Sequence, residues 1–396
     1  MNKYLKPALL FSLGLSVISS QWSVAASSIG IGMLVIMLIV KYVIEKKIDI
    51  DRAVMWLFFL FIVSQVISSL LSPDFLTSFS HLFRRIPQYA VFIGSVLIIR
   101  DGCTTKRFLA VFFLFSGLIC LIEIIKFIGD YTPYLQLSEY RLQYFGYPVT
   151  NGAIKMLIIL LLVPFIFHRK NFILKRWILI LILILLITTL FLTNARSAFL
   201  GLFISLIAYG AICNRYFVLI FVIVVTAALL IAPPALTERI MSIADLNHMS
   251  NRSRIVMWNT AFEIFKDSPV FGHGDIDINQ LYRKYKIPEF HGEGSHMHNN
   301  IIQLTVNFGL FGLLIWSALM IRIIIKQLQI LNITRNDEFT HLLAVVSLCS
   351  MIAFNVAGLT EWNFGDAEFA VVMWFSLSLA FIAGNIYNAE RHSNNI

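Results

Sequence analysis

Long apolar segments recur along the whole chain of 396 residues and constrain its fold more than any other feature. A helix of roughly 20 apolar residues is long enough to cross the hydrocarbon core of a bilayer. About twelve segments have this character. They lie near residues 8–25, 27–44, 53–71, 86–100, 108–127, 149–167, 177–193, 197–213, 216–233, 299–320, 339–358 and 368–386. The sequence therefore predicts an all-α integral membrane protein with about 12 transmembrane helices, forming one polytopic domain over residues 1–396.

Composition excludes most soluble alternatives. Hydrophobic residues make up 58% of the chain and charged residues only 13%, whereas soluble proteins carry about twice that share of charge. A cytosolic enzyme, a secreted disulfide scaffold, a disordered tail and a DNA-binding domain all fit poorly. We expect membrane lipids as surroundings and no nucleic acid as partner.

The distribution of Lys and Arg predicts how the chain crosses the membrane. In the short connections, most basic residues fall on the side that carries the N-terminus, and this bias marks the cytoplasmic side. Both termini are then cytoplasmic, and the long segment 234–297, between spans 9 and 10, faces outward. The first apolar run, with Lys3 and Lys6 before it, also resembles a signal peptide. Either interpretation leaves residue 27 outside.

The outer segment 234–297 contains one predicted amphipathic helix, near residues 252–266. Ile255, Trp258, Phe262 and Phe265 recur there at helical spacing. The sequence Asp267-Ser268-Pro269 ends the pattern. We expect this helix to lie on the outer membrane boundary with Trp258 on its apolar face.

Two arginines of the outer side are candidates for binding an anion. Arg196 lies in a tight connection between two spans, where it either reaches to the surface or lines a polar cavity. Arg254 lies in the first turn of the predicted amphipathic helix, where free N–H groups and the helix dipole already favour phosphate. Contact with a lipid headgroup is the alternative for Arg254.

Three further outer arginines are weaker candidates for substrate binding. Arg141 lies in the connection 128–148, and Arg84 and Arg85 form a pair near the start of the fourth span. They either line the same polar chamber as Arg196 and Arg254 or contact anionic lipid, and the sequence leaves both interpretations open.

His298 is the candidate base, because imidazole can accept a proton near neutral pH and this residue stands at the outer start of the tenth span. It could instead cap that helix. His296 and His298 could also bind a metal, but an H-x-H pair without carboxylates or cysteines beside it in the sequence is a weak signal. We therefore expect no metal and no cofactor. Asn299 is a candidate substrate contact.

Outward arginines together with a histidine, in the absence of a nucleotide-binding loop or an acid-rich cluster, indicate a phosphate-bearing substrate. A phosphorylated lipid fits this site, since its tail stays in the bilayer while its headgroup meets the arginines.

Several motifs then resemble one known family, the O-antigen ligase and polymerase superfamily. They fall within the region 149–320 and are Leu192-Thr193-x-x-Arg196-x-Ala198, Arg254-x-x-x-Trp258, Pro269-x-x-Gly272-x-Gly274, His298-Asn299-x-x-x-Gln303 and Gly309-x-x-Gly312. The number of spans and the long outer loop before the tenth span agree with the same resemblance.

The resemblance implies an inverting, metal-independent glycosyltransferase with a GT-C-like architecture in the inner membrane of Gram-negative bacteria, with its active site on the periplasmic face. Such a ligase moves O-antigen polysaccharide from undecaprenyl pyrophosphate to a sugar hydroxyl of lipid A-core. The motif match implies catalytic roles for His298, Arg254 and Arg196. Glu361 and Asp366, in the last outer connection, either orient the histidine or act as base themselves.

Three alternatives remain. An O-antigen polymerase would join two lipid-linked glycans. A protein O-oligosaccharyltransferase of the same superfamily tends to be longer than this chain. A transporter of an anionic lipid or sugar would show broken spans in both halves of the chain, and only Gly309 and Gly312 suggest a break.

Overall fold

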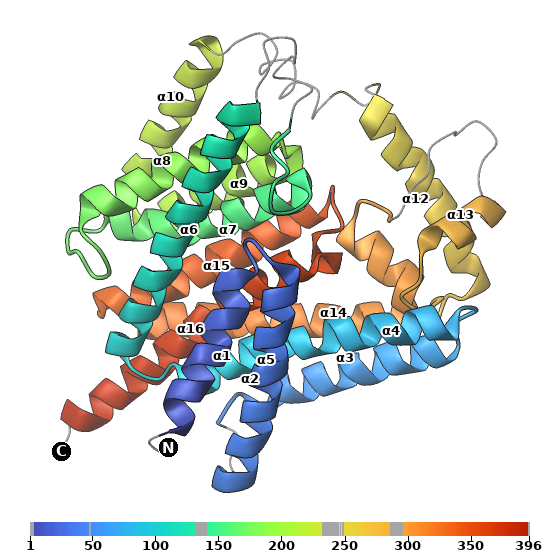
Figure 1. Cartoon of the computed structure of the whole chain (residues 1–396), viewed down its shortest axis with the longest axis horizontal. Coiled ribbons are helices and arrows are strands. Elements are labelled where there is room, and N and C mark those ends of the chain that lie inside the picture. The colour runs from blue at the N-terminus through green and yellow to red at the C-terminus, as the bar shows by residue number, and fades with distance from the viewer. Residues whose placement is uncertain are drawn as a thin grey trace.

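The computed structural model describes residues 4–46, 49–130, 141–231, 249–285 and 296–394, together with Asp245 and Asn247. Every regular element within these residues is helical (Figure 1). The elements are α1 (Leu5–Ser19), α2 (Val24–Glu45), α3 (Arg52–Leu70), α4 (Phe75–Arg85), η1 (Ile86–Gln88), α5 (Tyr89–Ile98), α6 (Gly102–Asp130), α7 (Pro148–Phe167), α8 (Arg176–Thr193), α9 (Arg196–Cys213), α10 (Arg215–Ile231), α12 (Met249–Asp267), α13 (Ile278–Tyr285), α14 (Asn300–Ile333), α15 (Glu338–Gly358), η2 (Asn363–Gly365) and α16 (Ala367–Asn394).

As predicted, the described chain is all-helical and has many helices that suit a multi-pass membrane protein. Nine of the described helices are long and apolar enough to span a bilayer: α2, α3, α6, α7, α8, α9, α14, α15 and α16. Each of the twelve expected segments coincides with a helix, but α1, α5 and α10 are shorter than a typical span. The number twelve stays a prediction.

The fourth expected span differs from its prediction. Its helical stretch begins at Phe75, well before the expected residue 86, and runs through α4, η1 and α5. The 3₁₀ turn of η1 contains Pro87, which has no N–H to donate and tightens the helix there. α4 escapes a search for apolar runs because it is amphipathic, with Ser78 and Arg85 among its buried residues. The first half of the chain therefore does contain an interrupted helix.

Three helices form the centre of the molecule. α7 and α16 are buried along almost their whole length, and α15 along most of it. Aromatic rings pack around the fully buried Trp374 of α16, including Phe58, Tyr89 and Trp316 from α3, α5 and α14. In Figure 1 the blue hairpin of α1 and α2 and the two chain ends lie on one side of this centre, and α12 and α13 lie on another.

A break in α14 receives a loop from the segment that follows α12. Gly309 interrupts the helix with a φ of 62°. The N–H groups of Leu310 and Phe311 then donate to the carbonyls of Pro269 (2.9 Å) and Val270 (3.0 Å). Because these bonds replace those lost in the helix, the break is filled by protein backbone.

The same loop makes two more backbone bonds to α14. The N–H groups of His273 and Gly274 donate to the carbonyls of Val306 (3.0 Å) and Asn307 (2.8 Å). A Cβ atom at Gly272 would lie 2.5 Å from the backbone of Asn307. The Pro269–Gly274 motif and the Gly309 motif are thus two halves of one backbone contact that ties α12 to α14.

Replacing Gly309 with alanine should destabilise the protein. The residue has a positive φ, and an added Cβ would lie 2.2 Å from the Val270 carbonyl oxygen. Strain of this kind costs about 1–3 kcal/mol before any clash, so Gly309→Ala should lower the Tm of the detergent-solubilised protein. Gly32→Ala is the matched control, because no atom lies within 4 Å of its Cβ position. Equal Tm values for the two variants would contradict this account of the break.

A buried ion pair links α6 and α7 within the helical bundle. Lys155 Nζ lies 2.8 Å from Glu123 Oε2, and both side chains are almost fully buried. Asn151 Nδ2 donates to Glu123 Oε1 at 2.6 Å, and the Asn151 side-chain oxygen accepts from Lys155. The three side chains therefore satisfy one another away from water, as buried charges require.

Candidate active site

His298 lies just before α14 in an uncommon backbone conformation, with a φ of 47°. The next residue, Asn299, caps the helix by accepting from the N–H groups of Ile301 (2.9 Å) and Ile302 (3.1 Å). Its amide nitrogen donates to the carbonyl of Leu359 at 2.8 Å. These bonds hold His298 at the start of α14, beside the connection between α15 and α16.

Glu361, in that connection, is the carboxylate that two histidines and one arginine approach. His298 Nδ1 lies 2.8 Å from Glu361 Oε1, and His296 Nδ1 lies 3.7 Å from the same oxygen. Arg254 Nη2 lies 3.7 Å from Glu361 Oε2. Burial opposes the charge of Glu361, but the hydrogen bond with His298 and the charges of the neighbouring cations hold its pKa below the usual value.

The contact with Glu361 gives His298 a defined orientation. A carboxylate at Nδ1 selects the tautomer in which Nδ1–H donates, so that Nε2 carries the lone pair that can accept a proton. Of the two roles considered for Glu361 from the sequence, this geometry favours orientation of the histidine. It would also stabilise the imidazolium after proton transfer.

His296 stays neutral near neutral pH. Its ring lies edge-on to that of His298, with 4.2 Å between the centroids. Burial and repulsion by His298 lower the pKa of His296 to about 4, although Glu361 acts in the opposite direction.

Arg254 reaches the site from α12, which the loop at Gly309 ties to α14. Burial lowers the pKa of the Arg254 guanidinium and Glu361 opposes that shift. Trp258, one turn further along α12, donates from Nε1 to the carbonyl of Met297 at 2.8 Å. α12 is therefore joined directly to the histidine segment.

α12 has a second apolar face besides the predicted one. Its buried apolar residues are Met257, Ala261 and Ile264, which pack against α13 and α14, whereas Ile255 and Phe262 are exposed. Residues that contact lipid would be exposed in this way, so the placement of this face on the outer membrane boundary stays a prediction.

A network of buried amide and charged side chains supports the histidine segment. Gln303 Oε1 accepts from the N–H of Met297 at 2.7 Å, and its nitrogen donates to Asn307 Oδ1 at 2.9 Å. Asn307 in turn donates to Asp275 Oδ1 at 2.9 Å, and Asp275 pairs with Arg85 Nη2 at 2.7 Å. The network runs from α4 to the residue before His298.

The structure separates the two arginines that the sequence grouped together. Arg85 is buried, and its guanidinium lies 5.3 Å and 5.4 Å from the ring centroids of Trp362 and Phe364, next to Glu361 in the chain. Arg84 is exposed. Arg85 thus supports the Glu361 connection, whereas Arg84 faces away from this buried network.

Arg141 binds the turn between α8 and α9, which Arg196 follows in the chain. Arg141 Nε donates to the carbonyl of Thr193 at 2.9 Å, and its Nη2 to that of Asn194 at 3.4 Å. Arg196 is the first residue of α9. Arg141 therefore binds the end of α8 directly beside Arg196.

The packing of α9 against α15 indicates where Arg196 lies. A Cβ at Gly201 would be 3.1 Å from the Ala353 carbonyl and 3.3 Å from the Ala357 Cβ. With α9 beginning and α15 ending on the same side, Arg196 is at the end of the bundle from which the Glu361 connection departs.

Asp366, at the end of that connection, is a second, half-buried carboxyl group. It accepts from the hydroxyl of Thr150 at 2.7 Å. Burial raises its pKa to about 7, with a further contribution from the charge of Glu361.

This shift predicts a pH dependence of stability. The folded pKa of Asp366, about 7, exceeds its ordinary value of 3.8, so the folded state holds the proton more tightly. Its contribution is complete below pH 3.8 and is lost as the pH rises through 7. Asp366→Asn should therefore reduce the fall in Tm between pH 3.8 and pH 7. Thermal unfolding in detergent would measure it, with the surface variant Asp277→Asn as control. An unchanged pH profile would contradict the assignment.

Comparison with known families adds an independent finding. Residues 181–317 match the family model described as O-antigen ligase. This match supports membership of the O-antigen ligase and polymerase superfamily. No curated protein matches the chain. Members of this superfamily are glycosyltransferase-like enzymes.

The segment matched to the O-antigen ligase family contains Arg196, Arg254 and His298 but ends before Glu361. From the sequence, Glu361 was only a secondary candidate, and Asp275 and Asn307 were not predicted. The available signal for Glu361 was its place in a short connection on the same side as His298. Asp275 gave no comparable signal, because its partner Arg85 is remote in the sequence.

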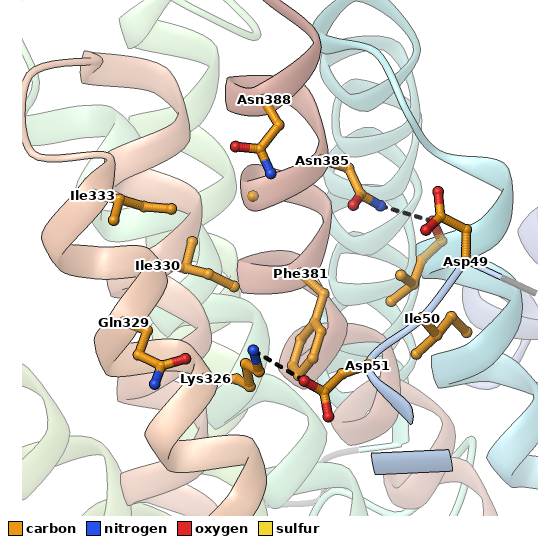
Figure 2. A pocket seen from close by; sticks show the side chains of 12 residues that line it. Asp49, Ile50, Asp51, Lys326, Gln329, Ile330, Ile333, Phe381, Asn385 and Asn388 are labelled. Carbon is orange, nitrogen blue, oxygen red and sulfur yellow. Dashed lines mark hydrogen bonds and ion pairs between the residues drawn. The ribbon is translucent and has the colours of Figure 1, made fainter. Parts of the chain in front are cut away.

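The protein also has a pocket far from the histidines. About 350 Å³ in volume, it lies near the opposite ends of α14 and α16 and is lined by Asp49, Asp51, Lys326 and Asn385 among others (Figure 2). Lys326 Nζ pairs with Asp51 Oδ2 at 2.9 Å. Since its charged side chains are paired with other side chains of the protein, we do not assign the transfer reaction to it.

Proposed function

We propose that this protein is an O-antigen ligase of the Gram-negative inner membrane, which transfers the polysaccharide from undecaprenyl pyrophosphate to a sugar hydroxyl of lipid A-core. The observation that supports the proposal best is the convergence of His298 and Arg254 on the buried Glu361. A base and an anion-binding group thereby stand side by side, as transfer from a pyrophosphate donor requires.

The reaction would be a single displacement with inversion. His298 Nε2 takes the proton of the acceptor hydroxyl while that oxygen attacks the anomeric carbon of the donor. The bond from this carbon to the pyrophosphate oxygen breaks, and the electron pair leaves with undecaprenyl pyrophosphate. Glu361 stabilises the imidazolium that forms.

The arginines would act on the leaving group. Arg254, near the start of α12, and Arg196, at the start of α9, would bind the pyrophosphate and neutralise its developing charge. Because pyrophosphate is a good leaving group, the reaction does not need the second carboxylic acid that ordinary glycosidases use. The mechanism also requires no metal or cofactor.

The remaining arginines would have different roles. Arg84 is exposed and free to meet a headgroup, either of substrate or of anionic lipid. Arg141 would hold the turn that presents Arg196. With both termini cytoplasmic, the site opens to the periplasm, and the GT-C-like arrangement inferred from the family resemblance suits a lipid-linked donor.

Genetic complementation distinguishes the candidate functions. A Gram-negative strain without its own ligase would receive the wild-type gene or the His298→Ala variant, and lipopolysaccharide and undecaprenyl-linked glycan would be resolved on gels. A ligase restores long chains on lipid A-core, while His298→Ala leaves bare lipid A-core beside long lipid-linked chains. Single-repeat glycan joined to lipid A-core would indicate a polymerase instead.

Transport is the alternative that gains one observation from the structure, since helices are interrupted both at Pro87 and at Gly309. The break at Gly309 is filled by the loop 269–274, however. If complementation left both glycan pools unchanged, transport would become the leading interpretation.

A further inference from the structure

The two histidines and Glu361 form a set of donor atoms that no part of the reaction above requires as a set. One nitrogen of each imidazole and one oxygen of Glu361 lie within 4.8 Å of one another. The sequence showed only an H-x-H pair without a carboxylate. The structure supplies that carboxylate from a connection 63 residues away from His298.

The spacing of these atoms suits a small transition-metal ion. Zn²⁺ binds imidazole nitrogen and carboxylate oxygen at about 2.0–2.2 Å in tetrahedral sites, which places two donor atoms about 3.3 Å apart. The distances from Glu361 Oε1 to His298 Nδ1 and His296 Nδ1 are 2.8 Å and 3.7 Å. Shifts of a few tenths of an ångström would bring both pairs to that separation.

The ligand set also leaves a coordination position open. Two histidines and one carboxylate are a known donor set for zinc with a fourth, exchangeable position. The side chains of His296 and His298 are 29% and 32% exposed, so an ion can reach the site without opening the bundle. Glu361, by contrast, is buried and fixed, and its second oxygen faces Arg254.

We propose that His296, His298 and Glu361 form a capture site for Zn²⁺, and that the bound ion inhibits the enzyme. The ion would replace the hydrogen bond between His298 and Glu361 and would turn the imidazole from a base into a ligand. The inhibitory half of this inference rests on the proposed function of His298, whereas the binding half does not.

Arg254 provides a distinctive expectation. Its guanidinium lies 3.7 Å from Glu361 Oε2 and repels a cation held by the same carboxylate. Arg254→Gln should therefore bind the metal several-fold more tightly than wild type. Arg254→Gln would thus weaken transfer and strengthen metal binding. Unspecific adsorption of the ion would not produce this pair of effects.

Binding can be tested with Co²⁺, whose visible d–d absorption reports coordination by protein ligands. The full-length protein in detergent, with any affinity tag removed, would be titrated with Co²⁺, and Zn²⁺ would then be added as a competitor. We expect d–d bands that Zn²⁺ abolishes. His296→Gln and Glu361→Gln should each weaken binding at least about 10-fold, the lower limit even for loss of a supporting group.

His168→Gln is the matched control, because this histidine follows α7 at its other end and should leave the titration unchanged. Absence of the bands in wild type, or bands that persist in both His296→Gln and Glu361→Gln, would overturn the site. Transfer assays with and without Zn²⁺ complete the test. Inhibition that a chelator reverses supports the inference. Saturated Zn²⁺ binding without inhibition would refute both the inhibitory role of the ion and the role of His298 as base. The metal site itself would stand in that case.

Discussion

His298→Ala should lower the rate of glycan transfer by roughly 100 to 10,000-fold, the usual contribution of a general base. The loss should appear in kcat, because the imidazole acts on the proton of the acceptor hydroxyl in the transition state. Initial rates with purified protein, undecaprenyl-pyrophosphate-linked glycan and lipid A-core would measure it. The Tm should stay near that of wild type, since the ring is partly exposed.

Glu361→Gln is the informative companion of this variant. Glutamine keeps the size of the side chain but loses the charge that orients His298 and stabilises its cationic form. We expect a smaller loss than for His298→Ala, together with a shift in the pH profile of kcat. If purified His298→Ala kept near-normal turnover on both substrates, the general-base assignment would be wrong.

Arg254→Ala should reduce transfer by about 100 to 1,000-fold, as expected when one electrostatic donor to a developing anion is removed. Arg254→Lys should recover only part of the rate, because an ammonium group lacks the planar fork that binds two phosphate oxygens. The same assay with purified substrates would measure both variants.

The neighbouring Arg252 offers a matched control on the same helix. It is exposed, whereas the Arg254 side chain is only 18% exposed. Arg252→Ala should leave transfer within about twofold of wild type. A similar loss for both variants would point to general attraction of acidic lipid by the face of α12, in place of a specific phosphate contact.

Most helices could be predicted from the sequence, because a membrane span has a local signal, which is a long apolar run. The start of the fourth one was misplaced, because α4 is amphipathic and its buried face includes Arg85. Burial of this arginine depends on Asp275, which lies almost two hundred positions later in the chain. A local sequence pattern cannot predict an ion pair between residues so far apart in the chain.

The site was predictable in its residue types but not in its arrangement. His298 and Arg254 stood out as polar groups in an apolar chain, and Glu361 resembled an ordinary solvated carboxylate at a helix end. Only the packing of α15 and α16 against α14 reveals that Glu361 is buried against the histidine. The glycine motifs were recognised as a family feature, and the structure gives their physical reason in the backbone contact between Gly272 and Gly309.

The buried pair of Glu123 and Lys155 has a consequence for how the chain enters the membrane. Each charge is costly in lipid alone, and each is satisfied only by the other and by Asn151. α6 emerges from the ribosome before its partner α7 exists, so the Glu123 carboxylate must be shielded from lipid until Lys155 arrives. The two helices should therefore leave the insertion machinery as a pair, and a nascent chain that stops between them should be held back or degraded.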